Sequence, residues 1–172
     1  MEDFFTNYFN SLNKRIGTAD SFILKDAADR IHRVGLEGKK IIIVGNGGSA
    51  AMASHVTVDF TKAAGIRAVN FNEADLLTCL ANDYGYKHWV EKALEFYADR
   101  GDMAIIISSS GKSSNMINGV KKAQALGLGT ITFSGFSPDN PLRKNGDLNL
   151  WVDSTVYNIV EMTHHVWLVA IV

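Results

Sequence analysis

Five serines gather at one junction of the chain, where an aliphatic segment gives way to a helix-like one. The segment 103–107 is followed by Ser108, Ser109, Ser110, Ser113 and Ser114. Hydroxyl groups, together with unpaired backbone N–H groups at the positive end of a helix, can bind a phosphate. Serine is also an ordinary helix-capping residue, which accounts for one or two of the five. An ATP-binding P-loop is not expected, because its pattern would need glycine at Ile106. The cluster therefore predicts a phosphate-binding loop.

A second loop that could bind an anion follows an earlier aliphatic run. Residues 41–44 lead into Gly45-Asn46-Gly47-Gly48-Ser49-Ala50, which contains the G-x-G-x-x-A pattern of dinucleotide sites. Its glycines would let backbone N–H groups at a helix N-terminus approach an anion. A dinucleotide site also needs an acidic residue about 20 positions later, and the nearest candidate, Glu73, is typical of the first turn of a helix. A strand–helix turn without a ligand is the plainer alternative, and we expect no nucleotide cofactor.

Titratable side chains occur at helical spacing in two places. His55 and Asp59 lie four residues apart after the glycine loop. Glu161 precedes His164 by three residues and His165 by four. Residues at these spacings share one face of a helix. A carboxylate and an imidazole that face one pocket can act as general base and acid, or can bind zinc. A surface ion pair is the alternative for each pair taken alone.

The elements that must position these residues alternate between helices and strands. Amphipathic helices are predicted over 4–16 and 22–34, and buried strands over 41–44, 66–71, 103–107, 129–133 and 148–152. Further helices are predicted over 50–61, 72–80, 88–98, 114–126 and from about 154 onward, with a turn at 81–86. This alternation predicts an open parallel α/β sheet with right-handed crossovers. Since ligands bind beyond the carboxyl ends of such strands, both candidate loops lie at the expected binding edge.

Length and composition exclude several classes of protein. The chain has 172 residues, of which 47% are hydrophobic, and a formal net charge of −1. That length suits one domain with a substantial core, and the lack of excess positive charge argues against a nucleic-acid partner. Cys79 is the only cysteine, so neither a disulfide framework nor a cysteine-based zinc site is expected. No apolar run approaches the roughly 20 residues that span a membrane, and the acidic N-terminus is unlike a signal peptide. We expect a cytoplasmic globular protein without a membrane partner.

Three motifs follow one another in a specific order. They are Gly45-Asn46-Gly47-Gly48-Ser49-Ala50 with His55, then Ala81-Asn82-Asp83-Tyr84-Gly85-Tyr86, then Ile107-Ser108-Ser109-Ser110-Gly111-Lys112-Ser113. Together they resemble the sugar isomerase (SIS) domain family, and most closely its phosphoheptose isomerase group. The resemblance covers nearly the whole chain. It implies a single SIS domain over 1–172, built as a three-layer sandwich on a flavodoxin-like, five-stranded parallel sheet. The extra N-terminal helices over 1–36 would make oligomer contacts.

The same resemblance implies an activity and an assembly. The activity is isomerisation of a sugar phosphate between aldose and ketose through an enediol, most closely sedoheptulose 7-phosphate to a heptose 7-phosphate. This reaction would supply heptose for lipopolysaccharide or other surface glycans. The assembly is a homotetramer with active sites at the subunit interfaces. Many members of the group bind zinc, so zinc is the cofactor to consider.

The resemblance also assigns roles to individual residues. His55 matches a metal-binding histidine. Asp59 stands where the family has a glutamate that serves as base and metal ligand, so its reach is one methylene shorter. His164 is the third metal ligand that we consider. Positions that bind the substrate or its phosphate are matched by Asn46, Gly47, Gly48, Ser49, Asp83, Ser108, Ser109, Ser110 and Ser113.

The last helix departs from the family pattern. In an alignment without gaps, the family's glutamine falls on Val160 and its catalytic histidine on Leu168, and neither replacement can bind a metal or move a proton. His164 lies four residues from each and should share their helix face. We therefore predict that His164 takes over the imidazole role, with Glu161 or His165 assisting. Replacing His164 by alanine would then remove activity without lowering stability.

A protein of a different class is the alternative to the enzyme. A non-catalytic SIS-fold protein that binds a sugar phosphate or a protein partner would resemble the replication-initiator-associating proteins. The intact serines favour the enzyme, whereas Val160 and Leu168 favour the alternative.

Oligomerisation is also predicted from the residues themselves. The apolar last helix and an aromatic stripe offer more apolar surface than one such domain covers, and large exposed patches mark interfaces. The stripe consists of Phe4, Phe5, Tyr8 and Phe9.

Overall fold

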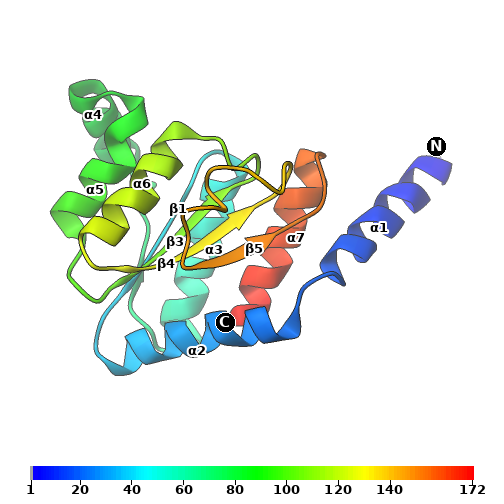
Figure 1. Cartoon of the computed structure of the whole chain (residues 1–172), viewed down its shortest axis with the longest axis horizontal. Coiled ribbons are helices and arrows are strands. Elements are labelled where there is room, and N and C mark those ends of the chain that lie inside the picture. The colour runs from blue at the N-terminus through cyan, green and yellow to red at the C-terminus, as the bar shows by residue number, and fades with distance from the viewer. Residues whose placement is uncertain (1) are drawn as a thin grey trace.

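A five-stranded sheet forms the centre of the protein in a computed structural model that describes residues 2–172 (Figure 1). Its strands are β1 (Ile41–Gly45), β2 (Ala68–Val69), β3 (Met103–Ser108), β4 (Gly129–Ser134) and β5 (Leu148–Trp151). They lie in the order β2-β1-β3-β4-β5, and every neighbouring pair is parallel. All residues of β1 and β3 are buried, because helices cover both faces, and this explains their unbroken aliphatic runs. Met1, the first residue of the expected domain, lies outside the described residues.

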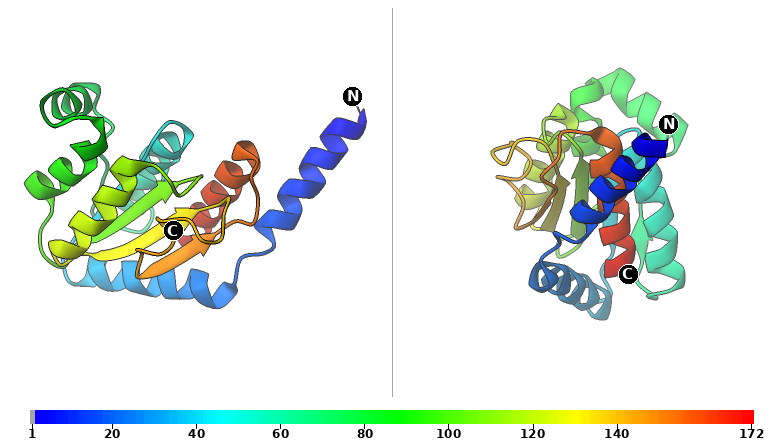
Figure 2. Two further views of the ribbon diagram at one scale, coloured as in Figure 1. Left: turned by 45° about the horizontal axis from the view of Figure 1, so that its top comes forward. Right: turned by 90° about the vertical axis from the view of Figure 1, so that its right-hand side faces the viewer.

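Helices cover the sheet on both sides (Figures 1 and 2). One face carries α2 (Ser21–Leu36), α3 (Gly48–Lys62) and α7 (Tyr157–Ile171). The other carries α4 (Ala74–Tyr84), α5 (Trp89–Tyr97) and α6 (Ser114–Ala125), with the short 3-10 helix η1 (Tyr86–His88) between α4 and α5. Strand side chains alternate between the two cores: in β1, Ile41 and Ile43 face the first and Ile42 and Val44 the second. The predicted three-layer sandwich is confirmed.

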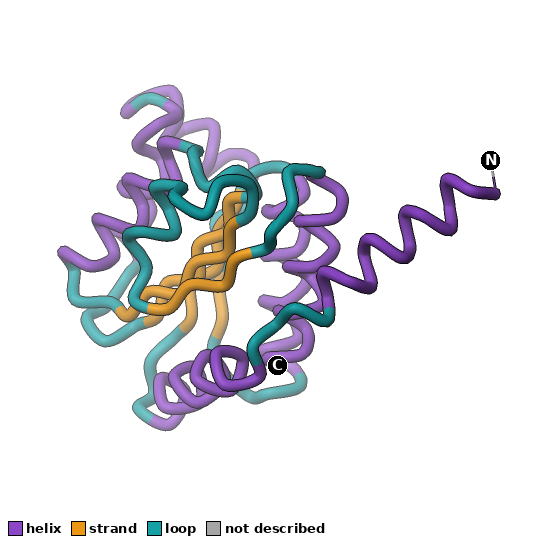
Figure 3. The backbone as a smooth tube through the Cα atoms, turned by 45° about the vertical axis from the view of Figure 1, so that its right-hand side comes forward, coloured by secondary structure: helices purple, strands orange, loops and turns teal. Residues whose placement is uncertain are grey.

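The N-terminal helix α1 (Glu2–Ile16) projects away from the sheet and, among the described residues, contacts only α7 closely (Figures 1 and 3). Its C-terminal end is fixed where the Trp167 indole N–H donates to the Ile16 carbonyl oxygen (3.0 Å). Phe4, Phe5 and Phe9 are each more than half exposed. The predicted aromatic stripe is therefore uncovered in the single chain.

Two elements differ from their predicted ranges. β2 has only two residues, shorter than the predicted strand over 66–71. α4 continues through the predicted turn at 81–84, because Ala-Asn-Asp-Tyr is compatible with a helix and the chain reverses only at Gly85, whose φ is 84°. Within residues 2–172, no helix has the length and apolar character needed to cross a membrane.

Candidate functional site

Two loops meet at the carboxyl edge of the sheet, after the neighbouring strands β1 and β3. Gly45 at the end of β1 pairs with Ile107 in β3, so the loops that follow begin side by side. The chain leaves β1 toward α3 on one face and β3 toward α6 on the other, which makes this the switch point where ligands bind in such folds. A cavity of about 110 Å³ opens there, lined by Asn46, Ser49, Ile107, Ser108, Ser109, Ser110, Ser113, Tyr157 and Glu161. The structure thus brings the glycine and serine loops together.

The serine loop is a tight turn that directs donors to this cavity. Gly111 turns the chain with a φ of 65°, and its N–H donates to the Ser108 carbonyl oxygen (2.9 Å). Ser108 Oγ donates to Ser113 Oγ (3.1 Å), and the Lys112 N–H donates to Ser110 Oγ (3.3 Å). Ser113 is the N-cap of α6, but its hydroxyl makes no capping hydrogen bond. The positive end of α6 is therefore left to interact with a bound anion.

The N-terminus of α3 meets the same cavity. Its N-cap is Gly47, whose φ of 54° favours glycine, and its first turn holds the buried Ser49. The Glu161 carboxylate lies against this end: Oε1 accepts from Ser109 Oγ (3.4 Å), and a methyl group added at Gly48 would lie 2.5 Å from Oε2. A helix N-terminus stabilises a carboxylate placed there. Glu161 therefore brings one negative charge into an otherwise uncharged lining.

Three residues at this site were not assigned a role from the sequence. Asn115 in α6 exchanges two hydrogen bonds with the Asn46 carboxamide (2.8 and 3.1 Å), and the Tyr86 hydroxyl donates to Asn46 Oδ1 (3.1 Å). Tyr157 lines the cavity one helical turn before Glu161. The available signals were the closeness of Asn115 to the serine cluster and the place of Tyr86 in the second motif.

A second polar cluster lies between α3 and α7. His55 Nδ1 is 2.7 Å from His165 Nε2, and His55 Nε2 is 3.3 Å from Asp59 Oδ2. Burial lowers the pKa of the His165 imidazole, and the neighbouring His55 lowers it further, while Asp59 raises it. The predicted pair of His55 and Asp59 is thus present, and its partner on the last helix is His165.

The structure contradicts the placement of His164 in the pocket. Its imidazole is fully buried, Nε2–H donates to the Ser134 carbonyl oxygen (3.0 Å), and the ring lies edge-on to Phe133. Burial lowers its pKa from 6.5 to about 4, although the hydrogen bond to Ser134 acts in the opposite direction. His164 does share a helix face with Val160 and Leu168, but all three are fully buried because that face packs on the sheet.

Asp83 also lies apart from the cavity. It is exposed near the end of α4, where its carboxylate accepts a hydrogen bond from the Asn82 amide (2.9 Å), and it is not among the lining residues. The cause is the extension of α4 over the segment predicted as a turn. In this chain by itself, Asp83 does not reach the position expected of a substrate contact.

The residues considered for zinc do not fit a zinc site. His164 turns Nε2 toward Ser134 in the core, away from His55 and Asp59. Asp59 and His165 meet opposite ring nitrogens of His55, so these side chains do not converge on one point. In the described part of the chain, no group of three or more His, Cys, Asp or Glu side chains could hold a metal ion.

Comparison with known proteins gives consistent matches. The family model described as "SIS domain" matches residues 4–135. The chain is 38% identical over 113 residues to the phosphoheptose isomerase of Fusobacterium nucleatum, covering 63% of this chain and 58% of that protein. It is 37% identical over 144 residues to a probable phosphoheptose isomerase of Thermoplasma acidophilum, covering 80% and 78%. The solved phosphoheptose isomerase of Neisseria gonorrhoeae is similar with a TM-score of 0.90 and 26% identity, covering 99% of this chain and 96% of that one.

Proposed function

This chain belongs to the SIS domain family and, within it, to the phosphoheptose isomerase group, and on that premise we propose that it isomerises a sugar phosphate. The proposed substrate is sedoheptulose 7-phosphate, and the proposed product is the corresponding aldose, a heptose 7-phosphate, formed through an enediol. The observation that carries this proposal is the serine-lined cavity at the switch point of the sheet. Serine hydroxyls and two helix N-termini are suited to a phosphate group.

The direction of the bound sugar follows from the face that α7 turns toward α3. Tyr157, Glu161 and His165 recur at four-residue spacing, about 6 Å per step along the helix axis. A phosphate on the serine loop would lie beside Glu161, and a seven-carbon chain that runs along α7 would bring its reacting end toward His165. His165 contacts His55, which in turn contacts Asp59. We assign to Asp59 the proton transfer between the first two carbons and to His165 the exchange of protons with the sugar oxygens.

These proton transfers use side chains alone, because the donor set at His55, Asp59 and His165 does not fit zinc. Zinc addition therefore belongs in the experiment as a variable.

The test is NMR of sedoheptulose 7-phosphate incubated with the protein in D2O, with and without zinc. Exchange of hydrogen beside the carbonyl, or formation of the aldose, is the expected result. A melting temperature that rises with the sugar while no exchange occurs would favour the non-catalytic binding protein. The absence of both exchange and binding would overturn the proposed function.

Two variants and a control test the assigned residues. Asp59→Asn and His165→Ala are each expected to slow exchange by about 10²–10⁴-fold, the usual contribution of general acid–base catalysis. Asp29→Asn, which removes an exposed carboxylate paired with Lys25 on α2, should leave exchange unchanged. Exchange at the normal rate in both active-site variants would refute the assignment.

We also propose a homotetramer with the active site at subunit interfaces. An apolar groove of about 550 Å³ lies beside His55 and His165, lined also by Tyr8, Phe9, Leu12, Met162, Val166 and Val169. α1 stands away from its own sheet with its aromatic residues exposed, so a second copy of the chain can cover both groove and helix. Light scattering should give a tetramer at micromolar concentration, and Phe9→Asp should dissociate it. A monomer in the unaltered protein would overturn this proposal.

The setting of the reaction is proposed from the family alone. We place it in the cytoplasm, in the supply of heptose for lipopolysaccharide or other surface glycans. Loss of heptose from the surface glycans of a strain that lacks this chain would support the assignment, and unchanged glycans would contradict it.

A further inference from the structure

The carboxamide of Asn46 is held in one orientation at the edge of the cavity. Its Oδ1 accepts hydrogen bonds from Asn115 Nδ2 (2.8 Å) and from the Tyr86 hydroxyl (3.1 Å), which occupy both lone pairs. Its Nδ2 donates one hydrogen to Asn115 Oδ1 (3.1 Å). One N–H remains for a ligand, and no acceptor does. In this orientation, Asn46 can only donate to whatever the cavity holds.

Asn115 is placed to enforce this orientation. It is 2% exposed in the first turn of α6, directly after the serine loop, so its side chain has little freedom to turn away. Without the Asn115 carboxamide, the side chain of Asn46 would be free to rotate and present Oδ1 toward the cavity. An oxygen in that position would repel an anion that the N–H attracts.

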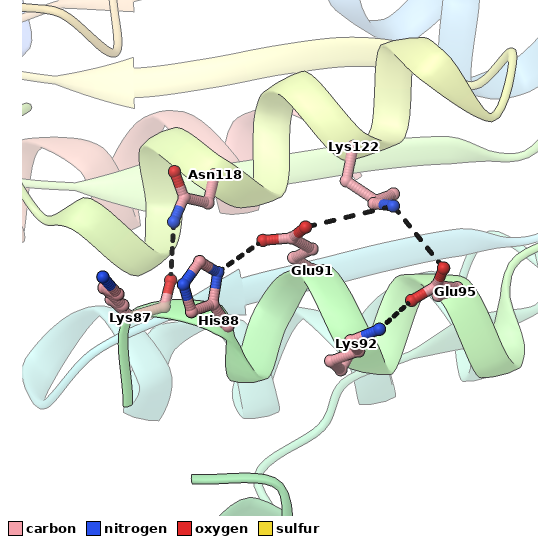
Figure 4. A network of polar contacts seen from close by, with 7 residues as sticks. All are labelled: Lys87, His88, Glu91, Lys92, Glu95, Asn118 and Lys122. Carbon is pink, nitrogen blue, oxygen red and sulfur yellow. Dashed lines mark hydrogen bonds and ion pairs between the residues drawn. The ribbon is translucent and has the colours of Figure 1, made fainter. Parts of the chain in front are cut away.

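Tyr86 reaches Asn46 from η1. Its side chain is 54% exposed, but the backbone around it is anchored (Figure 4). Asn118, one turn after Asn115 on α6, donates to the Lys87 carbonyl oxygen (2.9 Å). His88 Nδ1 lies 2.8 Å from Glu91 Oε2, which ties the end of η1 to α5. α6 thus holds both partners of Asn46, one directly and the other through η1.

We propose that Asn115 and Tyr86 are positioning residues that fix Asn46 as a donor to an anionic oxygen, the phosphate of the bound sugar phosphate. The oxygens of a phosphate dianion only accept hydrogen bonds, whereas a sugar hydroxyl also has a proton to donate, so an Asn46 held as a donor favours the phosphate end, while the Glu161 carboxylate in the same lining acts against an anion. The hydroxyls of Ser49, Ser110 and Ser113 can donate to it as well, whereas those of Ser108 and Ser109 donate to Ser113 and Glu161. The identity of the sugar rests on the proposed function, but the test below needs only phosphate binding.

Calorimetry with inorganic phosphate and with sedoheptulose 7-phosphate tests this role. Tyr86→Phe and Asn115→Ala should each weaken phosphate binding by about 2–10-fold, the range of a single hydrogen bond. If the protein turns over the sugar, KM should rise by a similar factor while kcat changes less. Tyr84→Phe is the matched control, because within residues 2–172 its hydroxyl makes no hydrogen bond, and it should bind phosphate normally.

Double variants separate positioning from a general structural effect. In an Asn46→Ala background, Tyr86→Phe and Asn115→Ala should cause no further loss, because both act through Asn46. Losses that add to that of Asn46→Ala, or normal binding by Tyr86→Phe, would overturn the proposal. If Asn115→Ala does not fold, Tyr86→Phe decides alone, since it removes one hydroxyl from an exposed side chain. Failure of the proposed function would show instead as phosphate binding without exchange in D2O.

Discussion

Replacing His164 by glutamine is expected to remove a pH-dependent loss of stability and to leave activity in place. The imidazole is fully buried, its Nε2–H donates to the Ser134 carbonyl oxygen, and burial lowers its pKa from 6.5 to about 4. Once the chain unfolds, the imidazole regains its ordinary pKa. Between these two values the unfolded chain binds a proton that the folded chain does not, so stability is complete above about pH 6.5 and falls as the pH is lowered.

The size of this effect follows from the difference between the two pKa values. One unit of pKa corresponds to about 1.36 kcal/mol. With a pKa of about 4 in the folded protein and 6.5 in the unfolded chain, the free energy of unfolding should drop by about 2 kcal/mol between pH 8 and pH 5. That is a large part of the usual margin of stability of a domain.

Urea unfolding at pH 8 and pH 5 measures the contribution of His164 as a difference between variants. Over this interval, the free energy of unfolding of His164→Gln should fall by about 2 kcal/mol less than that of the unaltered protein. His32→Gln, which removes an exposed imidazole on α2, is the matched control and should keep the full loss. Equal losses in His164→Gln and the unaltered protein would refute the reasoning. A large fall in exchange per folded molecule would instead restore a catalytic role to His164.

Three glycine and acid positions give further predictions. Gly48→Ala should displace the Glu161 carboxylate and slow exchange, while the melting temperature stays the same or rises, because alanine favours a helix. Gly111→Ala should lower both the melting temperature and phosphate affinity, because φ there is 65° and a methyl group would collide with Asn140; an unchanged melting curve would contradict this. Asp102→Ala should cost about 3–5 kcal/mol in urea unfolding, because Asp102 is 1% exposed and pairs with a lysine ammonium at 2.6 Å; a cost below about 1 kcal/mol would contradict it.

The parts of the site that depend on the sheet could be predicted from the sequence. The aliphatic runs over 41–44 and 103–107 mark strands buried on both faces, and helices separate them. Parallel strands carry their following loops to one edge, so the glycine and serine loops had to lie on the same side. Their direct contact depends on β1 and β3 being neighbours, which the resemblance to a flavodoxin-like sheet supplied.

The parts of the site that depend on which face of a helix meets the sheet could not be predicted from the sequence. Spacing of three or four residues shows which side chains share a face of α7 but not which face meets the sheet. Apolar residues occur on both sides of this helix, because Met162, Val166 and Val169 are exposed on the side away from the buried face, so its hydrophobic pattern gives only a weak direction. For the same reason the sequence could not choose between His164 and His165. Nor could it show that Asn115 and Tyr86 meet Asn46, since these three residues come from separate segments.

The apolar residues at the two departing positions can be explained by packing. Val160 lies against Gly135, where an added methyl group would come within 2.8 Å of its side chain, and Leu168 belongs to the same buried cluster. Both lie on the face of α7 that meets the sheet, with His164 between them. The face that carries Glu161 and His165 is separate, since positions one residue apart on a helix are about 100° apart. Val160 and Leu168 therefore leave polar groups intact on the neighbouring face, so loss of the usual residues does not by itself remove the means of proton transfer.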